Sequence, residues 1–132
     1  MDSSWCQAPN QPNKAIETQL NAWIKSNIPL IKTGEKSEAR RVFVKNGNSI
    51  IVVGSTFFNE TFSKNIKNKH LKRTITIAKE YSKWLPNAKW IFSEKANHHD
   101  GWYDVYEVTY KGERIRAKVK SETKILYTMR LL

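Results

Sequence analysis

The sequence predicts an α+β domain, with N-terminal helices and a small hairpin packed on a C-terminal four-stranded antiparallel sheet. Two observations support this fold class. Apolar and polar residues alternate over much of residues 88–131, in short runs separated by turns. Before residue 88, two stretches have apolar side chains at helical spacing, and two β-branched runs lie between them. We therefore expect helix, hairpin, helix and antiparallel meander, with one sheet face open.

The N-terminal residues 1–13 are rich in Ser, Gln, Asn and Pro, and we expect them to form a flexible lead. Residues 14–132 are enough for one domain with a packed interior and too few for two, and its core is expected at 41–131. Residues 14–26 predict an amphipathic helix, with Asn13 as its N-cap. Its apolar positions are Ile16, Leu20, Trp23 and Ile24.

The segment 41–53 predicts a hairpin, because two β-branched runs flank Asn46-Gly47, a pair that favours a tight turn. A second helical pattern starts at Phe58, where Asn59 can serve as the cap. It continues, after a bend near Lys69, until Pro86 ends it. Its apolar stripe comprises Phe62, Ile66, Leu71, Ile75, Ala78, Tyr81 and Leu85.

The register of the sheet follows from the lengths of its turns. A two-residue turn at Lys111-Gly112 places Glu107 opposite Arg116 and Thr109 opposite Arg114. A three-residue turn at 121–123 would then place Thr128 beside Arg116, and Arg130 beside Arg114. One face would be apolar and would carry Tyr106, Val108, Tyr110, Ile115, Ala117, Val119, Tyr127 and Met129. The other face would gather one carboxylate, three guanidinium groups and two hydroxyls.

The positive charge of the chain is large and uneven. The formal net charge is +11. Residues 1–60 hold seven Lys or Arg and five Asp or Glu, whereas residues 61–132 hold sixteen and seven. The run 63–73 carries five basic side chains, no acidic one, and His70. A basic half of this kind favours a polyanionic partner, most often nucleic acid.

Several functional classes are disfavoured by composition. Cys6 is the only cysteine, so no disulfide framework or cysteine zinc site is expected within one chain. The three histidines make a poor metal set, and we expect no metal and no cofactor. The N-terminus is polar and no apolar run is long enough to span a bilayer, so we expect a protein without a signal peptide or membrane segment, located in the cytoplasm and monomeric when free.

Arginines beside a carboxylate on an open sheet suit RNA cleavage. Guanidinium groups bind phosphate oxygens in pairs, whereas a carboxylate there would repel phosphate unless it moves a proton. The 2′-hydroxyl of RNA supplies that proton. The candidate catalytic residues are Glu107, Arg116, Thr128, His70, His98 and His99. The candidate contacts to RNA are Arg114, Arg130, Lys118, Lys69, Lys64, Arg73 and Tyr127.

Each of these residues also has a plainer interpretation. Glu107 and Arg116 make a favourable cross-strand pair on any solvated sheet. Thr128 suits a strand by its β-propensity, and His98-His99 can simply belong to a loop. The alternatives to an enzyme are therefore a non-catalytic nucleic-acid-binding module, or an interaction domain of a mobile element whose basic face meets an acidic protein.

Several short motifs, taken in order, resemble those of a known superfamily. They are a helix with Lys69-His70, the strand Tyr-Glu-Val-Thr-Tyr at 106–110, a Lys-Gly turn, a basic strand, and a last strand reading Leu-Tyr-Thr-Met at 126–129. This set is similar to the barnase, EndoU, colicin and RelE superfamily of metal-independent ribonucleases, and most similar to its phage-associated and polymorphic-toxin branch. The resemblance covers about residues 41–131.

The resemblance implies a cytotoxic endoribonuclease that cleaves RNA to a 2′,3′-cyclic phosphate. It implies Glu107, Arg116 and Thr128 as site residues, and His70 at the helix position of the phage branch. The last strand has no histidine, in which it departs from barnase. The resemblance also implies a toxin domain delivered by a larger carrier, action on RNA in the bacterial cytoplasm, and an acidic immunity or antitoxin partner.

Overall fold

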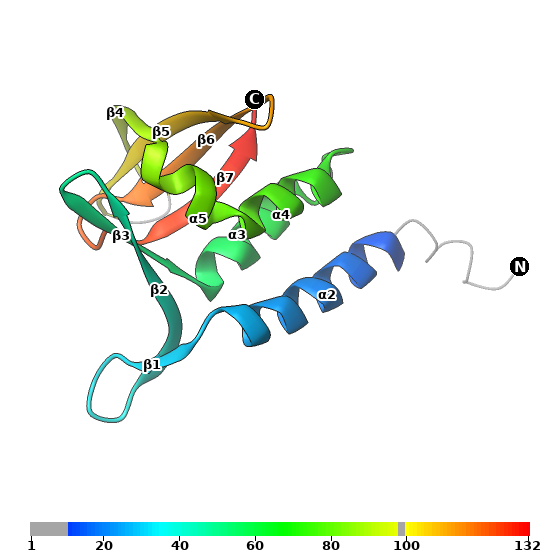
Figure 1. The fold of residues 1–132 in the computed structure, drawn as a ribbon, viewed down its shortest axis with the longest axis horizontal. Coiled ribbons are helices and arrows are strands. Elements are labelled where there is room, and N and C mark those ends of the chain that lie inside the picture. Colours follow the sequence, from blue (N-terminus) through cyan, green and yellow to red (C-terminus); the bar gives the residue numbers. More distant parts are fainter. Residues whose placement is uncertain (1–10, 98–99) are drawn as a thin grey trace, which may run out of the picture.

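The fold is described from a computed structural model, in which residues 11–97 and 100–132 are placed. It is α+β, as expected, with N-terminal helices, a three-stranded antiparallel sheet and a C-terminal four-stranded antiparallel sheet (Figure 1). The helices are α2 (Gln11–Asn27), α3 (Ser55–Asn65), α4 (Leu71–Lys79), α5 (Tyr81–Trp84) and the short 3-10 helix η2 (Leu85–Asn87). The strands are β1 (Leu30–Lys32), β2 (Glu38–Asn46), β3 (Ser49–Gly54), β4 (Lys89–Lys95), β5 (Trp102–Tyr110), β6 (Glu113–Lys120) and β7 (Leu126–Leu131).

The first helix begins earlier than its apolar pattern indicated. The helix α2 starts at Gln11, so residues 11–13 belong to it and not to a lead. Asn13 therefore lies within the helix and does not cap it; its side-chain amide donates a hydrogen bond to the carbonyl of Ile66 at 3.5 Å. The apolar side chains at Leu20 and Ile24 are buried, as predicted.

Helix α3 also begins earlier, at Ser55 and not near Asn59. The chain passes directly from β3 into this helix at Gly54, which has an extended backbone. A Cβ atom at Gly54 would lie 2.6 Å from the carbonyl oxygen of Arg40, so this close approach requires glycine. The predicted bend is a full break, because α3 ends at Asn65 and α4 starts at Leu71.

The hairpin of β2 and β3 has its turn one residue later than predicted. Asn46 pairs with Ser49, so the two turn residues are Gly47 and Asn48. Gly47 has φ of 58°, a conformation that glycine adopts without strain. The expected hairpin is therefore present, with its glycine in the first turn position.

The order of strands in the second sheet is β4-β5-β6-β7. The predicted register between β5 and β6 is confirmed: Glu107 lies opposite Arg116, and Thr109 opposite Arg114. The predicted register between β6 and β7 is wrong by two residues. Arg116 pairs with Arg130, and Lys118 pairs with Thr128.

A longer connection and a bulge cause the shift between β6 and β7. Strand β7 starts only at Leu126, after Lys124 has adopted a φ of 60°. Val119 pairs with Leu126 and Lys118 with Thr128, which leaves Tyr127 as the extra residue of a β-bulge. Tyr127 therefore leaves the apolar face on which the sequence pattern had placed it, while Met129 stays in the core.

The helices α3, α4 and α5 gather on one side of the second sheet, and α3 runs beside β7 (Figure 1). The core between them contains large, fully buried side chains from both layers, including Phe57, Phe58, Trp84, Ile115, Leu126 and Met129. None of the helices placed in residues 11–97 and 100–132 packs over the other face of the sheet, and side chains of that face form the site described below. Among residues 11–97 and 100–132, no helix is both long and apolar enough to cross a membrane.

Candidate functional site

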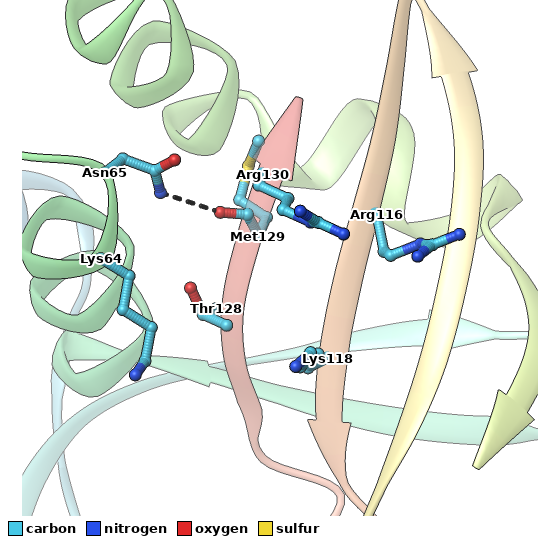
Figure 2. Close-up of a pocket in the computed structure, with 7 residues that line it drawn as sticks. All are labelled: Lys64, Asn65, Arg116, Lys118, Thr128, Met129 and Arg130. Carbon is cyan, nitrogen blue, oxygen red and sulfur yellow. Dashed lines mark hydrogen bonds between the residues drawn. The ribbon is translucent and has the colours of Figure 1, made fainter. Parts of the chain in front are cut away.

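A pocket of about 300 Å³ opens where β6, β7 and the last turn of α3 meet (Figure 2). Its lining residues are Lys64, Asn65, Arg116, Lys118, Thr128, Met129 and Arg130. Figure 2 shows Lys64 on the helix side of β7 and the two arginines on the other side, with Thr128 between them. The lining contains four cationic side chains and no carboxylate. We call it the cationic pocket.

The position of Lys64 depends on buried hydrogen bonds between α3 and β7. Asn65 donates from its side-chain amide to the carbonyl of Thr61 at 2.7 Å and to that of Met129 at 3.2 Å. The backbone N–H of Met129 donates to the hydroxyl of Thr61 at 3.2 Å. Two side chains of α3 thus satisfy backbone groups on the outer edge of β7. They fix Lys64 at the rim of the pocket.

Glu107 holds two arginines on the open face. Its carboxylate accepts a 2.8 Å hydrogen bond from Nε of Arg116, a second one from Nη2 of the same side chain, and one of 3.1 Å from Arg114. The side chain of Glu107 is only 17% exposed. The hydrogen bond from Arg116 is the main cause that lowers the pKa of Glu107 below its ordinary value of 4.5. The carboxylate is therefore ionised at neutral pH.

The remaining cations differ in whether they are paired. Lys118 forms a 2.6 Å ion pair with Glu94. In the part of the chain that the structure describes, Lys64 and Arg130 form no ion pair. Lys64 lies 5.5 Å from the ring centre of Tyr127, a cation–π contact that leaves its charge uncompensated. The cationic pocket thus carries positive charge that an anion can neutralise.

A second pocket of about 280 Å³ adjoins the first and shares Lys64, Lys118 and Thr128 with it. Its other lining residues are Glu94, Lys95, Asn97, Tyr103 and Tyr127. The rings of Tyr103 and Tyr127 are stacked, with centres 5.2 Å apart and planes 20° from parallel. We call it the tyrosine pocket.

Tyr127 is firmly positioned in this pocket. Its hydroxyl donates a hydrogen bond to Glu60 at 3.1 Å. Burial, followed by this hydrogen bond, raises the pKa of Tyr127 to about 12. Lys120 lies 5.4 Å from its ring centre, on a strand next to its own. Tyr127 thus stays protonated near neutral pH and contributes its ring and its hydrogen bond.

Most of the predicted site residues come together on the open face. Those found on this face or at the rim of its pockets are Glu107, Arg114, Arg116, Lys118, Thr128, Arg130, Lys64 and Tyr127. Arg116 lies opposite Glu107 on one neighbouring strand and opposite Arg130 on the other, so the predicted pairing of Arg116 with Thr128 is wrong. Thr128 lies one row away, next to Lys118.

The structure does not bring every predicted residue to this face. Arg73 forms a 2.5 Å ion pair with Glu113, which lies opposite Tyr110 on the helix-covered face. His70 is the exposed residue before α4, and neither His70 nor Lys69 lines the two pockets. His98 and His99 lie outside the described residues.

Sequence reasoning missed several residues of the site. Asn65 gave no signal, because a polar residue at a helix end is usually exposed. Glu94 and Asn97 fall in the stretch 93–101, which the sequence suggested was a loop, although Glu94 lies in β4 and both residues line the tyrosine pocket. Phe92 lies under Arg116, with the guanidinium carbon 5.6 Å from the ring centre. The alternation around 88–95 could not reveal this, because Ile91 is an extra residue in the pairing of β4 with β5.

Comparisons with known proteins identify no relative: no family model matches the chain, and neither a curated protein nor a solved structure matches it. Among the described residues, no group of three His, Cys, Asp or Glu side chains is arranged to hold a metal ion.

Proposed function

We propose that this protein is an endoribonuclease that cleaves RNA by transesterification, with no metal ion in the reaction. One observation carries the proposal. A carboxylate held by two arginines lies on an open sheet face beside a pocket lined by four cations and no carboxylate. The pocket suits a phosphate of the RNA backbone, and the neighbouring carboxylate suits the transfer of a proton next to it.

The chemistry uses a nucleophile that RNA itself carries. A base removes the proton of the 2′-hydroxyl, and the 2′-oxygen forms a bond to the adjacent phosphorus. The bond from phosphorus to the 5′-oxygen breaks, and an acid donates a proton to that oxygen. The products are a 2′,3′-cyclic phosphate and a 5′-hydroxyl. Arg116, Arg130 and Lys64 would stabilise the negative charge that develops on the phosphorane.

Glu107 is the proposed base, and its arginine partners set its properties. The lowered pKa keeps the carboxylate ionised and ready to accept a proton, although it also weakens the group as a base. Thr128 is buried at the boundary of both pockets, where its hydroxyl can donate to a phosphate oxygen. His70, His98 and His99 stay the candidates for the acid, with His70 the least favoured because it lines neither pocket.

We further propose that the domain acts as a toxin on RNA in the bacterial cytoplasm, carried by a larger protein and restrained by an acidic immunity protein. The net charge of +11 and its concentration after residue 60 support an acidic partner. Co-purification with a small acidic protein, together with relief of toxicity by Arg116→Ala, would support this biological setting.

The decisive experiment is incubation of the purified protein with total RNA in EDTA. We expect cleavage that falls at least about 100-fold in Glu107→Gln and in Arg116→Ala, because each loses a transition-state interaction. Arg73→Ala is the matched control, since its guanidinium pairs with Glu113 on the other face. Intact RNA in the presence of folded protein, or equal losses in all three variants, would overturn the proposal.

A specific observation favours a second candidate, a non-catalytic RNA-binding module. Glu107 accepts hydrogen bonds from both Arg114 and Arg116, so its role would be to orient them. In that case the protein binds RNA with strong salt dependence and does not cleave it. Glu107→Gln would then bind RNA as tightly as the wild type or more tightly.

A further inference from the structure

The two adjoining pockets differ in the chemistry of their walls. Both pockets are lined by lysines, but only the tyrosine pocket also contains a carboxylate, that of Glu94, and the amide of Asn97. A phosphate placed beside Glu94 would meet a negative charge. A nucleobase is neutral, and its edge carries both donors and acceptors. The second pocket is thus suited to a base, next to a first pocket suited to a phosphate.

We propose that the tyrosine pocket binds one nucleobase of single-stranded RNA and that Glu94 selects a base carrying an exocyclic amino group, cytosine over uracil. This inference rests on the proposed function for the identity of the ligand, RNA. The shared residues Lys64, Lys118 and Thr128 make the two pockets continuous, so one strand can occupy both.

The aromatic part of the pocket wall, formed by Tyr103 and Tyr127, suits the face of a base. Tyr127 is stacked on Tyr103 and fixed by its bond to Glu60, so the ring is held in place before a ligand arrives. Pre-ordered aromatic rings contribute to the binding of unpaired bases in single-stranded nucleic acids. A duplex would keep its base edges paired and could not present one to Glu94. The ligand is therefore a single strand.

The carboxylate of Glu94 is placed to read the edge of the base. Its Oε1 accepts from Lys118 at 2.6 Å, and the side chain is still 38% exposed. A carboxylate has about four acceptor sites, so Glu94 keeps the capacity to accept from a ligand. Cytosine presents its N4 amino group to such an acceptor, whereas uracil presents the O4 oxygen at the same position. A carboxylate therefore favours cytosine and repels uracil.

The test measures binding without cleavage. The probes are 2′-O-methyl hexamers of cytidine and of uridine, labelled with a fluorophore, which transesterification cannot cleave because the 2′-oxygen is blocked. We expect the wild-type protein to bind the cytidine strand about tenfold more tightly. In Glu94→Gln the amide can donate to O4 of uracil, so the ratio should fall to within about twofold.

The ratio of the two dissociation constants separates base recognition from the effect of charge, which changes the binding of both strands. Glu94→Gln also releases Lys118, which should tighten the binding of both strands through charge alone. Glu35→Gln removes the same charge from an exposed loop position and should leave the tenfold ratio unchanged.

Three results would overturn the inference: equal binding of both strands by the wild type, an unchanged ratio in Glu94→Gln, or no measurable binding of either strand. A protein that shows the ratio but leaves total RNA intact would retain this base site and would overturn the ribonuclease proposal. Cleavage of total RNA by a protein that binds both strands equally would support the ribonuclease proposal and overturn the base site.

Discussion

Asn65 donates a hydrogen bond to the backbone carbonyl of Met129 at 3.2 Å, and this contact ties the end of α3 to the outer edge of β7 (Figure 2). Both residues are buried, so water cannot replace the bond. The neighbouring Lys64 projects into the cationic pocket from the same turn. The buried hydrogen bond between Asn65 and Met129 thus positions the charge of Lys64 at the cationic pocket.

The first prediction concerns this contact. Asn65→Leu leaves the carbonyl of Met129 without its buried side-chain donor and removes the second bond to the carbonyl of Thr61, so we expect a loss of about 1–3 kcal/mol in the free energy of unfolding. Urea denaturation measures it. Asn27→Leu is the control, because Asn27 also donates to a helix carbonyl, that of Trp23, but at an exposed position. We expect its effect to stay within about 0.5 kcal/mol. Equal losses in both variants would refute the special role of Asn65.

The second prediction uses the lowered pKa of Glu107 to identify the base. The carboxylate stays ionised as the pH falls from 7 towards 4.5, because its pKa lies below that ordinary value. If Glu107 accepts the proton, kcat/KM should not fall over this range and should decline only at lower pH. If a histidine accepts it, kcat/KM should already fall at pH values well above 4.5, because imidazole gains a proton at higher pH than a carboxylate.

A profile of kcat/KM from pH 4 to 8 distinguishes the two bases. Glu107→Gln supplies the control, since its residual activity should lack the acid limb that belongs to the carboxylate. A wild-type profile that already falls at pH values well above 4.5 would move the role of base away from Glu107. The carboxylate would then serve to orient Arg114 and Arg116.

Sequence pattern predicted the part of the site that a short turn fixes. The Lys111-Gly112 turn has positive φ at both residues, and a two-residue loop of this kind allows one register. Glu107, Arg114 and Arg116 were therefore placed correctly. The same reasoning failed between β6 and β7, because the bulge at Tyr127 adds a residue that a period of two does not reveal.

Other parts of the site depend on how the helices pack, which alternation along a strand does not determine. Arg73 belongs to a basic run, yet α4 turns it towards Glu113 on the covered face. The open face is also less polar than the alternation indicated. Val105 lies between Phe92 and Lys118 on this face and is fully buried. Residue propensity and the alternation along a strand describe local structure, whereas the positions of Arg73 and Val105 depend on tertiary packing.

The third prediction concerns the binding of RNA phosphate. Lys64 and Arg130 form no ion pair within residues 11–97 and 100–132, so each can release a counterion when RNA binds. Lys64→Ala and Arg130→Ala should each reduce the slope of log Kd against log salt by about 0.7 to 1. Arg73→Ala should leave the slope unchanged, because Glu113 neutralises that side chain. Titrations of a single-stranded RNA at several salt concentrations measure the slopes.

That control decides where the RNA lies. Equal decreases in slope for all three variants would place RNA on both faces of the sheet. A decrease confined to Arg73→Ala would move the contact surface to the helix side. Either result would remove the cationic pocket from the proposed path of the strand.

The last prediction concerns the bond from Tyr127 to Glu60. Tyr127→Phe keeps the ring stacked on Tyr103 but removes the hydroxyl, so we expect a loss of about 1 kcal/mol at pH 8. The folded state raises the pKa of Tyr127 to about 12, which favours its protonated form. The stability that this provides is complete below the unfolded value of about 10 and is lost as the pH rises towards 12. The difference between wild type and Tyr127→Phe should therefore shrink between pH 8 and pH 11 in urea denaturation. A difference that stays constant would show that the hydroxyl is not held as described. Tyr127→Leu is the control, because it also loses the stacked ring. Its free energy of unfolding should be about 1 kcal/mol lower than that of Tyr127→Phe at both pH values.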